Sequence, residues 1–216
     1  MIAEGRIALR GEKVVTPATL LHDLRGVTVD GKPVPSAAAT RLFRFYKPQG
    51  TITAAHDPKG RTTIYDRLPS GLPRLMPVGR LDFMTEGLLL LTNDGELKRT
   101  LELPKSGVVR TYRARAFGQV TQAQLEKLAD GLTIDGVHYG SINADLERRT
   151  GRNAWIELSL TEGKNREVRR VLAHLGLQVS RLIRTAYGPF TLAGLEPGGV
   201  DETEQAELEQ FRKMLK

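Results

Sequence analysis

The sequence contains no cysteine. This absence excludes disulfides, thiolate nucleophiles and cysteine-based zinc sites, and it is typical of proteins in a reducing compartment. The four histidines are scattered along the chain without the spacing of metal ligands: His22, His56, His138 and His174. We therefore expect no metal site.

Long apolar segments are also missing. The longest run of large aliphatic residues, Leu88 to Leu91, is far shorter than a membrane span. Five charged residues among the first twenty exclude the apolar core of a signal peptide. No phosphate-binding glycine loop and no Gly-x-Ser-x-Gly elbow occur. The expectation is a cytoplasmic protein that contacts no membrane.

What the sequence does have is positive charge. Its 32 basic and 25 acidic residues give a net charge of +7 and a pI near 9.8. Such a balance indicates a polyanionic partner, most simply nucleic acid, although a surface adapted only for solubility has the same sign. Much of the excess lies between residues 161 and 185, where six basic residues face two acidic ones.

The first 38 residues form a unit of their own. They contain two short strand segments, "GRIALRGEKVVTPATLL" and "GVTVDGKPVP", with Gly11 and Asp30-Gly31 at the turns. A stretch this short buries no core by itself. The small residues of "PVPSAAAT", from Pro33 to Thr40, predict a linker to the next unit.

From Arg41 onward, strand and helix patterns alternate. Strands are predicted in "RLFRFYKPQG", "TYRARAFG" and "NAWIELSL", and helices in "VTQAQLEKLADGL" and "TEGKNREVRRVLAHLG". Thr121 and Gln124 predict a capping box for the first helix. Residues 201–216 predict a C-terminal surface helix. The fold class is α+β, with a mixed, mostly antiparallel sheet flanked by helices.

The basic helix places its arginines differently. Arg166 and Arg170 lie nearly opposite the apolar stripe, where a solvated face is the usual arrangement. Arg169 lies on the flank of the stripe. Two alternatives stay open for it: a guanidinium extended over the edge of the core, or a cation directed at a partner carboxylate.

A single acid stands out in "MPVGRLDFMTEGLLLLTNDG". The four leucines predict a strand covered on both faces, so Asp82 lies at the edge of the core, close to Arg80. An anionic, poorly hydrated carboxylate suits covalent catalysis. The alternative is an aspartate that caps a turn or pairs with Arg80, and spacing alone favours this structural role.

Four motifs in order resemble the RsuA-type bacterial ribosomal RNA pseudouridine synthases. They are "FYKPQG", "VGRLDFMTEGLLLLTNDG", "RTYRARAFG" and "LTEGKNREVRRVLAHLGLQVSRLIRTAYGPFTLAGLEPGG". The resemblance spans residues 41–200 and implies that this range is the catalytic domain. The stretches "DPKGRTTIYDRLP" and "LQVSRLIRTAYGP" are most similar to the RluB branch, which acts on large-subunit (23S) RNA.

The resemblance implies roles for individual residues. Asp82 is the expected nucleophile, Tyr112 the tyrosine that stacks on the target base, and Arg169 the cation that keeps Asp82 ionised. Val168 and Leu182 match apolar positions that line the pocket. No cofactor or metal is implied, and the target uridine leaves its stack to react. The expected RNA contacts are Lys47, Arg80, Lys164, Arg166, Arg170, Arg181 and Arg184.

The N-terminal unit resembles the second part of an S4 RNA-binding domain, without most of its two opening helices. We expect either a chain truncated at its start or a sequence that begins late. The expected activity is isomerisation of a uridine in 23S ribosomal RNA by a monomer. Small-subunit (16S) RNA is the alternative substrate, and a non-catalytic RNA-binding or ribosome-assembly protein is the alternative function.

Overall fold

The computed structural model describes residues 1–21, 23–34 and 38–215, which form two compact units, Met1–Thr40 and Arg41–Lys216. Residues 35–37 of the predicted linker and His22 lie outside the described residues. Among the described residues, no helix has the length and apolar character needed to cross a bilayer.

The N-terminal unit is a small antiparallel sheet with strand order β2-β1-β3-β4. Its strands are β1 (Ile7–Leu9), β2 (Glu12–Lys13), β3 (Val27–Val29) and β4 (Lys32–Pro33). Asp30 and Gly31 both have positive φ, as a two-residue hairpin turn requires. Val27 is the buried apolar residue among those described in this unit. The prediction that this stretch is too short for a core of its own is confirmed.

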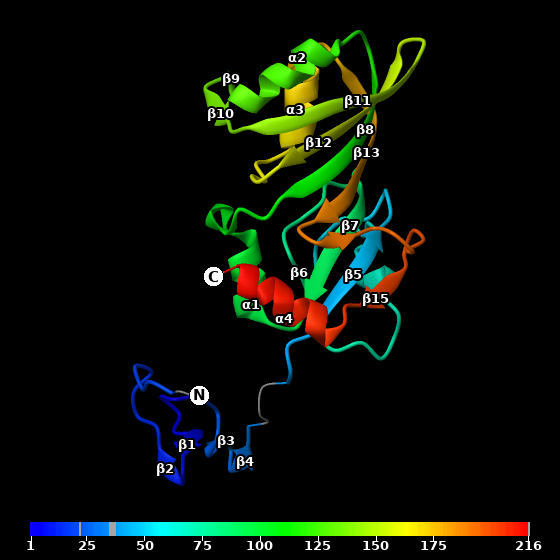
Figure 1. Cartoon of the computed structure of the whole chain (residues 1–216). Helices are drawn as coiled ribbons and strands as arrows, with labels where there is room; N and C mark the ends of the chain where they lie inside the picture. Colours follow the sequence, from blue (N-terminus) through cyan, green and yellow to red (C-terminus); the bar gives the residue numbers. More distant parts are fainter. Residues whose placement is uncertain (22, 35–37, 216) are drawn as a thin grey trace. The chain divides into compact units, whose positions relative to one another are not determined.

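The second unit is built on one long, twisted sheet (Figure 1). Within the described residues its main strand order is β11-β12-β8-β13-β7-β5-β15. The pairs along this order are antiparallel except β13–β7, which is parallel, so the predicted mixed, mostly antiparallel sheet is confirmed. The bounds are β5 (Leu42–Lys47), β6 (Met76–Pro77), β7 (Glu86–Thr92), β8 (Arg110–Phe117), β11 (Ile142–Thr150), β12 (Asn153–Leu160), β13 (Gln178–Tyr187), β14 (Phe190–Thr191) and β15 (Val200–Glu202).

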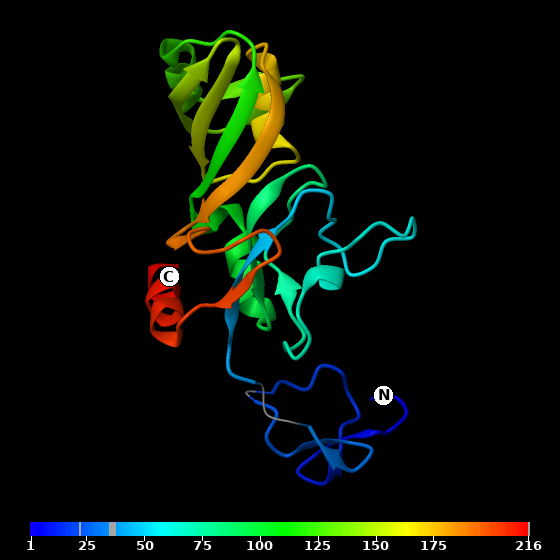
Figure 2. The same ribbon diagram turned by 90° about the vertical axis from the view of Figure 1, so that its right-hand side faces the viewer.

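Strand β7 is buried along its whole length, as the leucine run predicts. Leu88 and Leu90 pack with helices α1 (Gly95–Glu102) and α4 (Gln205–Met214). Leu89 and Leu91 belong to a separate core on the other face. Figure 2 shows α4 and the segment 50–75 on opposite sides of this part of the sheet. Cores on both faces fix β7 firmly in place, because burying one such side chain contributes roughly 1.5–3 kcal/mol.

The half of the sheet formed by β11, β12, β8 and β13 is covered by two short helices, α2 (Gln122–Glu126) and α3 (Glu167–His174). The capping box of Thr121 and Gln124 is confirmed. Helix α2 is shorter than predicted and continues as a 3₁₀ turn, Lys127–Asp130, which ends at Gly131. The hairpin β9 (Leu132–Ile134) and β10 (Val137–Tyr139) follows and leads into β11.

The predicted basic helix begins later than its sequence pattern suggests. Residues 161–166 form a loop, and Arg166 has a left-handed backbone conformation with φ 52°. The Glu167 side chain accepts a hydrogen bond from the Lys164 backbone N–H at 2.8 Å, which holds the loop beside the first helical turn. The periodicity of Val168, Val171 and Leu172 is confirmed, but a helical wheel does not apply to Arg166.

The C-terminal segment belongs to the second unit. Residues 201–216 do not form one separate surface helix, because strand β15 pairs with β5 before α4 begins. Helix α4 buries Leu208 and Phe211 against the core of α1, and Phe211 meets Phe190 edge to face at 5.0 Å. An apolar stripe on a terminal helix thus indicates packing onto the sheet rather than a free surface element.

One glycine allows the parallel strands to meet. Gly87 on β7 faces Arg184 on β13 and has φ +107°. A Cβ at this position would lie 2.7 Å from the Arg184 backbone nitrogen and closer still to its carbonyl oxygen. Neither backbone can retreat, because both strands are inside the sheet.

We predict that Gly87→Ala lowers the free energy of unfolding by about 3 kcal/mol or more, since it combines strain at positive φ with a backbone clash. Gly95→Ala is the control, because Gly95 starts α1 without positive φ and an added Cβ would find only ordinary contact. Denaturant unfolding compares the two variants. Equal stability of both would contradict the close approach of β7 and β13.

Candidate active site

Asp82 lies in a tight turn directly before β7. The Thr85 backbone N–H donates to the Asp82 carbonyl at 3.0 Å, and Thr53 bonds through its hydroxyl to both the N–H and the carbonyl of Leu81. The Asp82 side chain is 30% exposed. The turn therefore presents a partly hydrated carboxylate from a fixed backbone, as the sequence predicts for an acid at the edge of the core.

Lys47 fixes the backbone of this turn. Its side chain is fully buried, and its Nζ donates to the carbonyls of Pro48 at 3.2 Å, Asp82 at 3.1 Å and Thr85 at 2.9 Å. The prediction that Lys47 contacts RNA is therefore wrong: it has no exposed surface, and its donors bind the backbone that carries Asp82. Burial lowers the pKa of Lys47 to about 8, against the attraction of Asp82 and Glu86.

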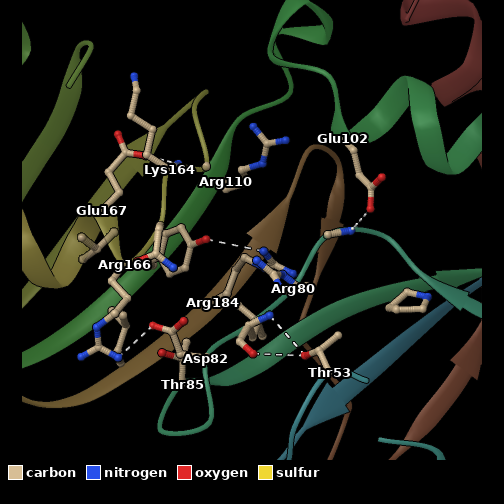
Figure 3. A pocket seen from close by; sticks show the side chains of 18 of the residues that line it. Thr53, Arg80, Asp82, Thr85, Glu102, Arg110, Lys164, Arg166, Glu167 and Arg184 are labelled. Atoms are coloured by element: carbon tan, nitrogen blue, oxygen red, sulfur yellow. Dashed lines mark hydrogen bonds and ion pairs between the residues drawn. The ribbon is translucent and has the colours of Figure 1, made fainter. Parts of the chain in front are cut away.

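The cation paired with Asp82 is Arg166. Its Nη1 lies 3.3 Å from Asp82 Oδ2, and Figure 3 shows the two side chains directed at each other. The expected ion pair of Asp82 with Arg169 is not formed. The difference arises because Arg166 is not part of the regular helix: it precedes α3 in a left-handed conformation, and its half-exposed side chain lies beside Asp82.

Arg169 instead fastens the helix to the neighbouring backbone. It donates to the Met84 carbonyl at 2.9 Å and to the Val179 carbonyl at 3.3 Å. Burial, together with the nearby Arg166, lowers the pKa of Arg169, while the charge of Asp82 opposes that shift. Arg169 thus lies within the field of Asp82 and binds the backbone of its turn without pairing with the carboxylate. Of the two alternatives that the sequence left open, this geometry agrees with a guanidinium at the edge of the core.

Asp82 opens onto a cavity of about 920 Å³. Tyr112 on β8 lines it, and its hydroxyl lies 3.5 Å from Nη1 of Arg184. Val168 and Leu182 also line it, in agreement with the pocket positions that the resemblance implies. The cavity is large enough for a nucleoside, since small-molecule sites span roughly 300–1,000 Å³.

The other predicted RNA contacts are divided between the cavity and its surroundings. Arg80 and Lys164 are exposed and line the cavity (Figure 3). Arg184 also lines it but is only 3% exposed, donates to the Leu88 carbonyl at 2.7 Å, and has a buried Nη2 without a hydrogen-bond partner. Arg184 is therefore part of the cavity wall rather than of the exposed surface, and its expected contact with RNA stays a prediction.

Two of the expected contacts lie away from the cavity lining. Arg181 pairs with Glu86 at 2.7 Å, and Glu86 also accepts a bond from the Tyr46 hydroxyl at 3.0 Å. Arg170 is exposed on α3, as predicted. Both remain on accessible surface.

Arg110 was not predicted as a site residue from the sequence. It is 6% exposed and lines the cavity. It donates to the Tyr187 hydroxyl at 2.9 Å and the Leu101 carbonyl at 3.1 Å, and it also bonds to the Thr161 carbonyl. It therefore joins β13, α1 and the loop before α3. The alternation of β8 could have indicated it, because Arg110 and Tyr112 share one face of the strand.

Glu167 was also missed. This carboxyl is 4% exposed and lines the cavity, and its Oε1 is buried without a hydrogen-bond partner. Burial raises the pKa of Glu167, and the nearby Glu162 adds to the effect. No signal in the sequence distinguishes it from an exposed acid in the first turn of a helix, where acids are common.

The described residues contain no group of three or more histidine, cysteine, aspartate or glutamate side chains arranged to hold a metal ion. Besides the Glu167 carboxyl, the cavity lining contains the partly exposed carboxylate of Asp82, further acidic side chains, aromatic rings that include Tyr112, and several guanidinium and ammonium groups. That set can supply a nucleophile, an aromatic face and binding for anions.

Comparisons with known proteins agree with this arrangement. Residues 41–174 match the family described as RNA pseudouridylate synthase. An RNA pseudouridine synthase of Rickettsia felis, itself uncharacterized, is 40% identical over 97% of this chain and 91% of its own length. The ribosomal large subunit pseudouridine synthase B of Pasteurella multocida is 39% identical over the whole of this chain, which spans 64% of that protein. A crystal structure of a pseudouridylate synthase superimposes with a TM-score of 0.73 at 25% identity, covering 97% of this chain and 90% of that one.

The chain belongs to the RNA pseudouridylate synthase family, as an RsuA/RluB-type enzyme.

The titration of Lys47 gives a stability prediction. Its pKa of about 8 lies below the ordinary 10.5, so between these values the unfolded chain binds more protons at this site than the folded chain. Stability contributed by this site is therefore fully present above pH 10.5 and is lost as the pH falls through 8. We expect the unfolding free energy of the wild type, relative to Lys47→Met, to increase with pH across this window.

Urea unfolding at several pH values between 7.5 and 10 measures this difference. Lys59→Met is the control, because it makes the same replacement at an exposed lysine. If the difference in unfolding free energy between the wild type and Lys47→Met does not change with pH, Lys47 is not desolvated in the folded protein.

Proposed function

We propose that this enzyme converts one uridine of large-subunit ribosomal RNA to pseudouridine, with Asp82 as the nucleophile. The observation that carries the proposal is the carboxylate of Asp82, held on a clamped turn at a cavity that also contains Tyr112. The name of the Pasteurella relative supports the large-subunit substrate. Small-subunit RNA is the alternative substrate.

In the proposed reaction, the target uridine leaves its stack and enters the cavity. Asp82 attacks the nucleoside, the N-glycosidic bond breaks, and the uracil rotates until C5 bonds to C1′ of the ribose. The C5 proton then leaves, with Tyr112 stacked on the base and placed to assist, and the bond to Asp82 breaks, which regenerates the carboxylate. N1, which has lost the ribose, takes up a proton. The reaction is an isomerisation, so no atom is gained or lost overall except the exchanged proton.

The charges around the cavity support an RNA substrate. Arg80, Lys164 and Arg166 are exposed at its lining, although Lys164 pairs with Glu162 and Arg166 with Asp82, so the phosphates that flank the target uridine can contact their solvent-facing sides. Binding should therefore weaken steeply with salt. The N-terminal unit, which resembles part of an S4 domain, would add RNA contacts. We take the enzyme to act as a monomer in the cytoplasm, where ribosomal RNA is modified.

Tritium release from RNA labelled at uridine C5 tests the activity, because the C5 proton must leave. We expect release from 23S transcripts and none from 16S transcripts. Release from 16S RNA alone would move the substrate to the small subunit. No release from either RNA would refute a ribosomal substrate and favour an RNA-binding or assembly role.

Asp82→Asn tests the nucleophile. The amide keeps the size of the side chain but is a poor nucleophile, so turnover should be abolished while RNA binding stays within about threefold, a change below 1 kcal/mol. Tritium release and filter binding measure the two effects. Asp130→Asn, an exposed acid at the end of the 3₁₀ turn, is the control. Full turnover by Asp82→Asn would exclude Asp82 as the nucleophile.

Two arginine variants separate the roles of Arg166 and Arg169. Arg166→Gln removes a half-exposed partner of Asp82, so kcat should fall about tenfold with little loss of stability. Arg169→Gln removes two hydrogen bonds to backbone carbonyls, so the unfolding free energy should fall by about 1–3 kcal/mol. Arg170→Gln is the control on the same helix.

Single-turnover kinetics and denaturant unfolding of the three variants give the answer. If Arg169→Gln reduces kcat at unchanged stability while Arg166→Gln leaves kcat intact, the Asp82–Arg166 pair is not the one that operates during the reaction.

A further inference from the structure

The residue next to the nucleophile presents an aromatic ring to solvent. Phe83 is 39% exposed, directly follows Asp82, and lines the same cavity. Met84, the next residue, is 49% exposed. Neither side chain belongs to the cores on the two faces of β7. The ring is therefore available to a partner.

The position of this ring is fixed by its backbone. The Phe83 carbonyl accepts a hydrogen bond from the Gly50 N–H at 2.9 Å. Its neighbours in the turn are fixed as well, because Lys47 binds the Asp82 and Thr85 carbonyls and Arg169 binds the Met84 carbonyl. A rigid turn lowers the entropy lost when a ligand contacts the ring.

An arginine accompanies the ring. The Arg61 guanidinium carbon lies 5.9 Å from the centre of the Phe83 ring, and Arg61 also lines the cavity. Asp57 holds this guanidinium through two hydrogen bonds of 2.9 and 3.0 Å and also accepts the Arg61 backbone N–H. Asp57 is itself buried, so the arginine is positioned before any ligand arrives.

An exposed ring beside a fixed guanidinium matches the chemistry of a nucleotide, with a flat base for the ring and a phosphate for the cation. We propose that Phe83 and Arg61 form a subsite that stacks the base of a nucleotide adjacent to the target uridine. This inference rests on the proposed RNA activity. Stacking on a phenyl ring tolerates every base, so the subsite contributes affinity and holds the RNA strand rather than reading its sequence.

The test compares Phe83→Leu with Phe83→Trp on a short ribosomal RNA hairpin that the wild-type enzyme modifies. We expect Phe83→Leu to raise KM about tenfold with kcat within about twofold, and Phe83→Trp to restore KM, because only the latter keeps an aromatic face. Phe117→Leu is the matched control: Phe117 is 41% exposed with Arg152 over its ring, but it does not line the cavity.

Abasic substitution in the RNA identifies the partner. The nucleotide on each side of the target uridine is replaced in turn by an abasic residue. At one of the two positions, removal of the base should raise the KM of the wild type about tenfold. The same removal should leave the KM of Phe83→Leu unchanged, because the ring and the base act as a pair.

Three outcomes would overturn the subsite: an unchanged KM for Phe83→Leu, abasic losses equal in both enzymes at both positions, or a reduced kcat at constant KM in both Phe83 variants, which would assign the ring to the turn itself. Each of these requires an active wild type. A wild type that is inactive on all ribosomal RNA would instead refute the proposed function, and this inference with it.

Discussion

The site depends on one buried ammonium group. Lys47 on β5 binds the carbonyls of Asp82 and Thr85, so it joins the end of β5 to the turn that precedes β7. Without these bonds the Thr85 carbonyl would be buried without a partner and the Asp82 carbonyl would keep only the Thr85 N–H, or the turn would open to water. Burial of Lys47 costs free energy, as its lowered pKa indicates. Its hydrogen bonds offset part of this cost, and they hold the backbone that carries the Asp82 carboxylate in one place.

The sheet brings the remaining groups to this turn. Strand β7 is fixed by a core on each face, and Gly87 allows β13 to approach closely enough to place Arg184 beside it. Strand β8 pairs with β13 and contributes Tyr112 and Arg110 to the same cavity. The loop before α3 adds Arg166. Elements far apart in sequence thus place an aromatic ring and several cations around Asp82.

Patterns with a period were predictable from the sequence, and side-chain partners across loops were not. The leucine run, the alternation of β8 and β12 and the capping box at Thr121 follow from local physics, and the order of motifs locates Asp82, Tyr112, Val168 and Leu182. The helical wheel failed at Arg166 because this residue precedes the helix in a left-handed conformation. Lys47 was misassigned because charge alone does not reveal burial, and Phe83 was overlooked because an aromatic residue in a turn resembles any core residue.

The central claim is that the Asp82 turn delivers the nucleophile to a uridine in this cavity. RNA carrying 5-fluorouridine at the target position tests it directly, because fluorine at C5 cannot leave as a proton and the attacked nucleotide is retained. Mass spectrometry of the digested complex should find the modified nucleotide on the peptide that contains Asp82, and none with Asp82→Asn. Attachment to another residue, or equal attachment in the variant, would contradict the account.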